Sequence, residues 1–348
     1  MSFVRYNPED SVISAESVVR AMWSGDAYTL STFFTASGYT EYYTEVYNGN
    51  PSVSSSELQF DVQYGHISGS GSVPINAAVP GYSPSRIIYG QYRNLVYGTE
   101  TENFSFDGGT TTAQQIYIIN IARSRYKQSL QPGSLNLTLS SGSATIKLTD
   151  DSNTTSLTRF IGENRVYYII SGSNGNAYTA SAATTPYYGI MLPDLGFIVL
   201  DASGSLSPYI QAANLSTATT QSNQIKLFNA ISSSVSASFQ LQSNETVSSR
   251  YFFTRVKNSD FNYTTNPSII DANGNLLFAT LINNPQTFIT TVGMYNDNNE
   301  LLAVAKLSKP LVKDFTKEAL IRIKIGRAHV WTPVTQWSRM PSSAWKKK

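Results

Sequence analysis

The sequence contains no cysteine and only two histidines among its 348 residues. Without cysteine there can be no disulfide, thiolate-bound zinc, iron–sulfur cluster or cysteine nucleophile. Two histidines leave little room for a histidine-based metal site or a Ser–His–Asp triad. Charged residues make up only 14% of the chain and hydrophobic residues 41%, which is the composition of a folded protein and not of a charge-driven disordered one.

Long apolar runs are also missing. The best candidate, residues 187–200, is interrupted by Pro193 and Asp194 and is too short to cross a bilayer as a helix. The first ten residues do not combine a cationic start with an apolar stretch, so we expect no secretory signal there. The sequence therefore predicts no membrane partner.

The last segment, residues 325–348, resembles a translated sequencing adapter, with tryptophan at a read-through stop codon and a closing lysine run. It holds five basic residues and no acidic one, and we interpret it as an artefact that takes no part in the fold. The remainder has 20 basic and 23 acidic residues, a formal charge of −3, whereas the whole chain has +2. We therefore expect no nucleic-acid partner.

Most of the chain has the composition and alternation of β-strands, with segments rich in Val, Ile, Tyr, Phe and Thr between Gly- and Asn-containing turns. The sequence predicts a mainly β protein made of multi-stranded, antiparallel, sandwich-like domains. The Asn-Gly pair at 273–274 predicts a type I′ hairpin turn. The expected strands are 58–64, 87–92, 116–121, 135–139, 144–148, 165–170, 196–200, 239–242, 251–256, 288–295, 301–307 and 319–324.

A short N-terminal helix and one or two minor helices complete the expected fold. Ser14 can cap a helix with an apolar stripe of Val18, Val19, Met22 and Trp23. A second helix is expected after a Ser/Thr-rich linker at 214–223, with Ile225, Phe228 and Ile231 on one face. The expected organisation is a helical arm at 1–34, a β domain at 35–204 and a second β domain with a short helix at 205–324.

No catalytic, cofactor-binding or metal-binding residue is assigned, and we do not expect an enzyme. The acidic run 150–153 could bind a hard cation, but it lacks the spacing of a calcium loop and is more typical of a solvated or ion-paired turn. The run 296–300 is better explained as a hairpin tip. His66 stands alone, as a structural histidine does, and residues 69–71 lack the ending of a phosphate loop.

Tyrosine is abundant, with 22 residues, and combines apolar area with a hydroxyl group. Each tyrosine alone is explained by strand propensity, but the set favours a protein interface or sugar stacking. The tyrosines in or beside expected strands are Tyr82, Tyr89, Tyr92, Tyr97, Tyr167, Tyr168, Tyr187, Tyr188 and Tyr295.

Four phrases resemble virion structural proteins of tailed bacteriophages, particularly contractile-tailed phages of the marine and cyanobacterial type. They are residues 83–97 (SPSRIIYGQYRNLVY), 116–133 (IYIINIARSRYKQSLQPG) with 148–152 (LTDDS), 252–267 (FFTRVKNSDFNYTTNP), and 292–310 (VGMYNDNNELLAVAKLSKP) with 314–318 (DFTKE). The matching phrases span roughly residues 83 to 324 and contain no catalytic motif.

The resemblance implies a non-enzymatic structural component of the virion, in the tail or baseplate, with other virion proteins as partners and a homo-oligomeric state. Two alternatives stay open at this point. A glycan-binding receptor module would need clustered, exposed tyrosines, and a polysaccharide-degrading tail protein would need two facing carboxylates.

Overall fold

The structure is a computed structural model that describes residues 7–36, 42–76, 82–106, 112–155, 158–178, 187–202, 204, 206–216, 222–233, 238–262 and 267–327. The protein is mainly β, with 44% strand and 12% helix, which confirms the expected fold class. No helix in these ranges is long and apolar enough to cross a membrane.

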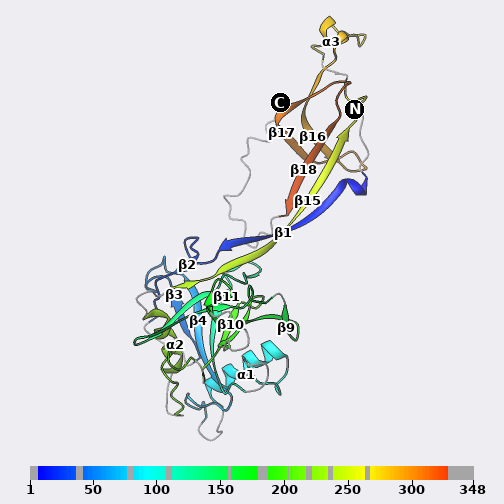
Figure 1. Ribbon diagram of the computed structural model, residues 1–348. Helices are drawn as coiled ribbons and strands as arrows, with labels where there is room; N and C mark the ends of the chain where they lie inside the picture. The colour runs from blue at the N-terminus through cyan, green and yellow to red at the C-terminus, as the bar shows by residue number, and fades with distance from the viewer. Residues whose placement is uncertain are drawn as a thin grey trace. The chain divides into compact units, whose positions relative to one another are not determined.

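Figure 1 labels the elements in chain order. The helical elements are η1 (Pro8–Asp10), α1 (Pro84–Tyr97), α2 (Ser222–Ser232) and α3 (Ala279–Asn283). The strands are β1 (Ser11–Ala21), β2 (Thr29–Leu30), β3 (Thr44–Tyr47), β4 (Leu58–His66), β5 (Gln115–Ile121), β6 (Ser129–Leu130), β7 (Asn136–Ser141), β8 (Ala144–Asp150), β9 (Arg159–Ile161), β10 (Asn164–Ser173), β11 (Asn176–Ala177), β12 (Gly189–Leu192), β13 (Phe197–Asp201), β14 (Phe239–Gln240), β15 (Gln242–Val256), β16 (Thr287–Tyr295), β17 (Leu301–Lys313) and β18 (Ala319–Arg327).

The chain forms two compact units. The central unit contains Ser17–Glu245, and the terminal unit contains Met1–Glu16 together with Thr246–Lys348. The divisions fall inside β1 and β15, whereas the sequence suggested boundaries near residues 34 and 204. The central unit is therefore one continuous segment, and the terminal unit combines two segments that are far apart in the sequence.

The central unit is built on a curled, 12-stranded antiparallel sheet. Its strand order is β2-β14-β7-β8-β10-β12-β13-β5-β4-β3, and β9 and β11 both pair with β10. Helix α1 packs against β4, and α2 packs against β7 and β4 (Figure 1). Most of the expected strands between 58 and 200 are confirmed, and the hairpin turns between them follow the Gly-containing segments.

Both faces of the central sheet are covered, which explains why its middle strands are apolar at nearly every position. Along β5, Tyr117 and Ile119 belong to one hydrophobic cluster, which also contains Leu227 and Ile231 of α2. The alternate residues of β5, Ile116 and Ile118, belong to a second cluster that contains Ile88 and Tyr92 of α1. Strands buried on both faces have continuous apolar runs instead of alternation.

The expected N-terminal helix is wrong, because residues 11–21 form strand β1. The strand order places β1 beside β15, a pairing that a local pattern cannot reveal. The β-branched residues of the segment, Val12, Ile13, Val18 and Val19, favour a strand once such a partner exists. Only the end of the predicted stripe, Met22 and Trp23, reaches the central core.

The expected strand at 87–92 is also wrong, because it lies inside helix α1. The buried residues Ile88, Tyr92 and Val96 recur every four positions, which is helical spacing. Pro84 occupies the first turn, and Gly98 ends the helix in a left-handed conformation with φ 71°. These start and stop signals were present in the sequence and identify the helix.

The type I′ turn occurs at a different Asn-Gly pair from the one predicted. Asn174 and Gly175 both have positive φ (51° and 76°) and join β10 to β11 as a two-residue loop. At 273–274 only Gly274 has positive φ, and its N–H donates to the carbonyl of Asp271, so the turn is of another type. The hairpin itself is present as a bridge between Ile270 and Leu276.

The expected helix after the linker is confirmed as α2, while residues 217–221 of the linker lie outside the described ranges. The two ends of the linker are joined, because the amide of Asn223 donates to the carbonyl of Asn214 at 2.9 Å. Asn223 is buried and also receives the N–H of Asn214 at 2.8 Å. This local bonding fixes the start of α2.

The terminal unit contains a hairpin, β16–β17, and the paired strands β15 and β18. The hairpin was expected, and so were strands at 251–256 and 319–324, but their pairing with each other was not predicted. The pairing of β18 extends to Ile325, Gly326 and Arg327, the first residues of the segment interpreted as an artefact. Residues 328–348 of that segment lie outside the described ranges. The buried hydrophobic residues of the described part of this unit are only Val256, Ala319 and Ile321.

Candidate functional site

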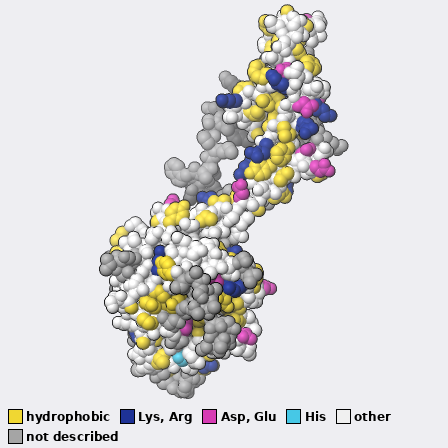
Figure 2. Space-filling model, in the orientation of Figure 1, with side chains coloured by type: hydrophobic (Ala, Val, Ile, Leu, Met, Phe, Trp, Pro, Cys, Tyr) yellow, Lys and Arg dark blue, Asp and Glu magenta, His cyan; other side chains and the backbone are white. Residues whose placement is uncertain are grey.

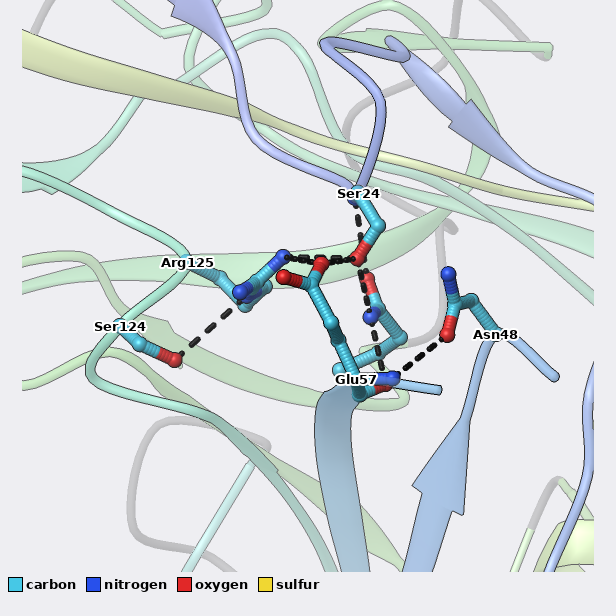
Figure 3. A network of polar contacts seen from close by, with 6 residues as sticks. Ser24, Asn48, Glu57, Ser124 and Arg125 are labelled. Carbon is cyan, nitrogen blue, oxygen red and sulfur yellow. Dashed lines mark hydrogen bonds and ion pairs between the residues drawn. The ribbon is translucent and has the colours of Figure 1, made fainter. Parts of the chain in front are cut away.

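A polar network in the central unit joins the turn after β1 to the start of β4 and the turn after β5 (Figure 3). The Ser24 hydroxyl donates to the Glu57 carboxylate. The Arg125 guanidinium donates to Ser24 Oγ at 2.7 Å and to Glu57 Oε2 at 2.9 Å. Gln59 Nε2 donates to Ser24 Oγ at 2.6 Å, and Asn48 Oδ1 accepts the N–H of Glu57 at 2.8 Å.

A serine beside a carboxylate suggests nucleophilic catalysis, but the hydrogen bonds of this network oppose it. The Ser24 oxygen already accepts from Arg125 and Gln59, which occupies the lone pairs that would attack a substrate. The hydroxyl of Ser24 and the charge of Arg125 lower the pKa of Glu57, so this carboxylate is a weak base. The network therefore functions as an anchor for the turn that follows β1.

The acidic pair Asp150 and Asp151 is buried and not solvated, which corrects the expected solvated turn. Asp150 accepts the N–H of Gly133 at 2.8 and 3.0 Å and that of Ser152 at 3.2 Å. Asp151 accepts the N–H of Tyr168 at 2.9 Å and forms an ion pair with Arg159, as the alternative of an ion-paired turn predicted. Burial raises the pKa of Asp150, while its N–H donors favour the charged form.

Both carboxylates accept hydrogen bonds from backbone N–H groups of neighbouring segments, and these bonds hold the loops at the end of β8. Their oxygens are therefore not arranged to bind a cation. No cluster of three or more metal-ligating side chains occurs in the described part of the chain. The run 296–300 is a hairpin tip, as expected, since Asn296 Oδ1 accepts the N–H groups of Asn298 and Glu300 at 3.1 and 2.8 Å.

A second pair of carboxylates, Glu45 and Asp61, lies directly opposite on β3 and β4. Asp61 accepts from the amides of Gln63 and Asn120 at 2.6 and 2.8 Å, and burial raises its pKa. Glu45 accepts the hydroxyl of Tyr47 at 2.6 Å. The Cβ atoms of residues opposite each other in a sheet are about 5 Å apart. Each carboxylate accepts hydrogen bonds from side chains of the same sheet, so both are engaged in structural contacts.

His66 is a structural histidine, as expected. It is buried at the end of β4, and its Nδ1 accepts the N–H of Ser68 at 3.1 Å. Burial lowers its pKa, which keeps the ring neutral. In the Gly-Ser segment beside it, the carbonyl of Gly69 accepts the hydroxyl of Ser83 at 2.8 Å, so this segment bonds to the start of α1.

The tyrosine set does not form one exposed surface. Tyr89, Tyr92 and Tyr188 are buried in the central cores, so for these three the interface interpretation is wrong and strand or helix packing explains them. Of the nine, only Tyr82 and Tyr295 are largely exposed, at 61% and 42%. A clustered tyrosine groove, which the glycan-binding alternative requires, is not formed by these nine residues.

Among the described residues, the terminal unit exposes fifteen large apolar side chains and the much larger central unit exposes thirteen, so exposed apolar surface is concentrated on the terminal unit (Figure 2). Strands β16 and β17 have no buried apolar side chain along their whole length. Leu302 is 65% exposed, and Phe288 and Ile282 are similarly exposed at 60% and 62%. The sequence reasoning missed this surface, although β17 offered a signal: it is apolar on both faces, which predicts burial on both faces.

A scan against protein-family models, a search of curated proteins and a search of solved structures each find no match to the chain.

Proposed function

We propose that this chain is a structural component of a tailed-phage virion, in the tail or baseplate, that acts through protein–protein interfaces. The observation that carries the proposal is the exposed apolar surface of the terminal unit. The sequence segments that resemble phage virion proteins support it. In the Ser24 network and the two carboxylate pairs, the side chains that catalysis would need are engaged in structural hydrogen bonds.

The terminal unit has too small a hydrophobic core to stabilise its fold in isolation. Its described residues bury three apolar side chains and expose fifteen large ones. Complete burial of a side chain such as leucine, isoleucine or phenylalanine contributes about 1.5–3 kcal/mol, so a large stabilisation is left unused in the isolated chain. Exposed apolar patches of this kind mark interaction sites, and a permanent assembly supplies the missing cover.

The proposal is tested on purified particles of a phage that encodes this sequence. Mass spectrometry of the particles, and of tails separated from heads, is expected to find peptides of the chain in the tail fraction. Antibodies to the chain are expected to label the tail or baseplate by electron microscopy. Absence of the chain from particles in which other tail proteins are detected would refute the proposal.

A further inference from the structure

One face of the paired strands β15 and β18 is basic. Residues opposite each other in an antiparallel pair lie on the same face, and the pairs here are Tyr251 with Lys324, Phe253 with Arg322, and Arg255 with Leu320. We call these six residues the basic face. The alternate residues of the two strands, which include Val256, Ala319 and Ile321, supply the small buried core.

The cations of the basic face are exposed and have no carboxylate partner within the described ranges. Arg255, Arg322 and Lys324 are exposed, and no acidic residue occurs along 246–256 or 319–327. Arg322 and Lys324 both lie over the ring of Tyr251, at 5.3 and 5.5 Å from its centroid. These contacts orient the two cations without neutralising them.

The apolar members of the basic face suit a protein partner. Leu320 is 62% exposed between the cations. The ring of Tyr251 already packs against Arg322 and Lys324, so a nucleobase that stacked on it would compete with these contacts. Three cations are also fewer than the six to ten phosphate contacts typical of strong nucleic-acid binding. The chemistry therefore favours a protein surface with carboxylates and exposed leucines.

Such a surface is present in the same unit, at the connection between β16 and β17. Asp297 and Glu300 are exposed, and Leu301 and Leu302 beside them are 53% and 65% exposed. We call these four residues the acidic tip. No basic residue occurs between 296 and 302, so the charge of the tip is −2.

The acidic tip has a defined geometry before any partner binds. The Asn296 amide donates to Glu300 Oε2 at 2.6 Å, and Asn299 adopts a left-handed conformation with φ 62°. The N–H of Asn299 donates to the carbonyl of Asn296 at 3.0 Å, which closes the turn. A preorganised protrusion loses little entropy on binding.

We infer that the basic face of one chain binds the acidic tip of a second copy. This inference rests on the proposed function, because it names the partner of the exposed terminal unit. Among the described residues no ion pair joins the two surfaces within one chain. Because each copy carries both surfaces, the contact is either made twice, reciprocally, in a two-fold dimer, or repeats from copy to copy into a ring or a filament.

Charge reversal of each surface tests the inference on the full chain. One variant carries R322E and K324E, the other carries D297K and E300K, and both are followed by sedimentation velocity up to about 100 µM. The wild-type chain is expected to self-associate at about 50 mM salt and much less at about 500 mM. Each variant is expected to weaken self-association about tenfold or more.

Mixing the two variants is the decisive measurement. The unchanged tip of the first variant fits the unchanged face of the second, and the two reversed surfaces also attract, so the mixture is expected to associate like the wild type. A control variant, K306E with K309E, makes the same change in net charge as R322E with K324E, but on β17 and outside both surfaces. It is expected to associate like the wild type. Circular dichroism of every variant confirms that it is folded.

Three results would overturn the inference: a wild-type chain that stays monomeric throughout, variants that associate unchanged, or a mixture that does not recover. Binding of a deoxythymidine oligonucleotide that R322E and K324E abolish would assign the face to nucleic acid and would also overturn it. These outcomes are separate from the detection of the chain in virions, so this inference can fail while the proposed function stands.

Discussion

Two buried tyrosines provide a matched test of the central core. Tyr89 and Tyr117 are each 1% exposed, so their rings contribute similar buried area. The Tyr89 hydroxyl donates to the carbonyl of Ala113 at 2.9 Å and accepts the N–H of Phe104 at 3.2 Å. The Tyr117 hydroxyl is buried and has no hydrogen-bond partner among the described residues. Replacing each by phenylalanine removes only the hydroxyl.

The two substitutions are expected to have different effects on the free energy of unfolding. In Tyr89→Phe, two buried backbone groups lose a partner, and this costs about 1–3 kcal/mol. In Tyr117→Phe, an unsatisfied buried hydroxyl is removed, so stability is expected to stay the same or rise by about 1 kcal/mol. The rings of both residues stay in place, so no cavity larger than one oxygen atom forms.

Urea unfolding followed by circular dichroism measures the difference. The slope of free energy against denaturant is expected to be equal for the wild type and both variants, so that a shift in midpoint reports stability. The hydrogen-bond reasoning would be refuted if Tyr117→Phe were destabilising by as much as Tyr89→Phe. It would also be refuted if Tyr89→Phe had the wild-type midpoint.

Two further predictions concern the central unit. Gly196 has φ +80°, and an added Cβ would clash with the Tyr126 hydroxyl, whereas Gly142 has φ +60° and open space around it. Gly196→Ala is therefore expected to lower the thermal midpoint more than Gly142→Ala, and equal shifts would contradict this. Burial raises the pKa of Tyr64 above its ordinary range. Tyrosine in the unfolded chain titrates at about pH 10, where the folded chain keeps the proton of Tyr64. The contribution of Tyr64 to stability is therefore expected to be complete below that pH and to fall above it. Unfolding midpoints from about pH 8 to 11 measure the fall, and a Tyr64→Phe chain that declines as steeply as the wild type would count against the assignment.

The strands of the central sheet could be predicted because each needs only a local signal. Runs such as those of β5 and β13 are rich in β-branched residues, and glycines with positive φ close the hairpins, as at Gly142 and Gly196. Neighbouring strands joined by such turns pair with each other, as β7 does with β8 and β12 with β13. Local propensity and tertiary pairing agree in these segments.

The state of the carboxylates could not be predicted, because burial depends on the groups that surround them. The run at 150–153 has the composition of a surface turn. Asp150 is nevertheless buried, and it accepts a hydrogen bond from the turn that contains Gly133. Gly133 donates to Asp150 and Tyr168 donates to Asp151, each from 17 positions away in the sequence, and no spacing rule indicates these two donors. The same holds for the Ser24 network, where Arg125 approaches across 101 positions.

The sequence by itself determined that this protein is mainly β, where most of its hairpins turn, and that α2 follows the Ser/Thr-rich linker. Only the tertiary structure decided that residues 11–21 form a strand, since the segment is held by contacts such as that from the Ser17 hydroxyl to Asn244, 227 positions away. It also decided that the apolar residues of β17 are exposed, because a local pattern specifies which residues avoid water and not what covers them.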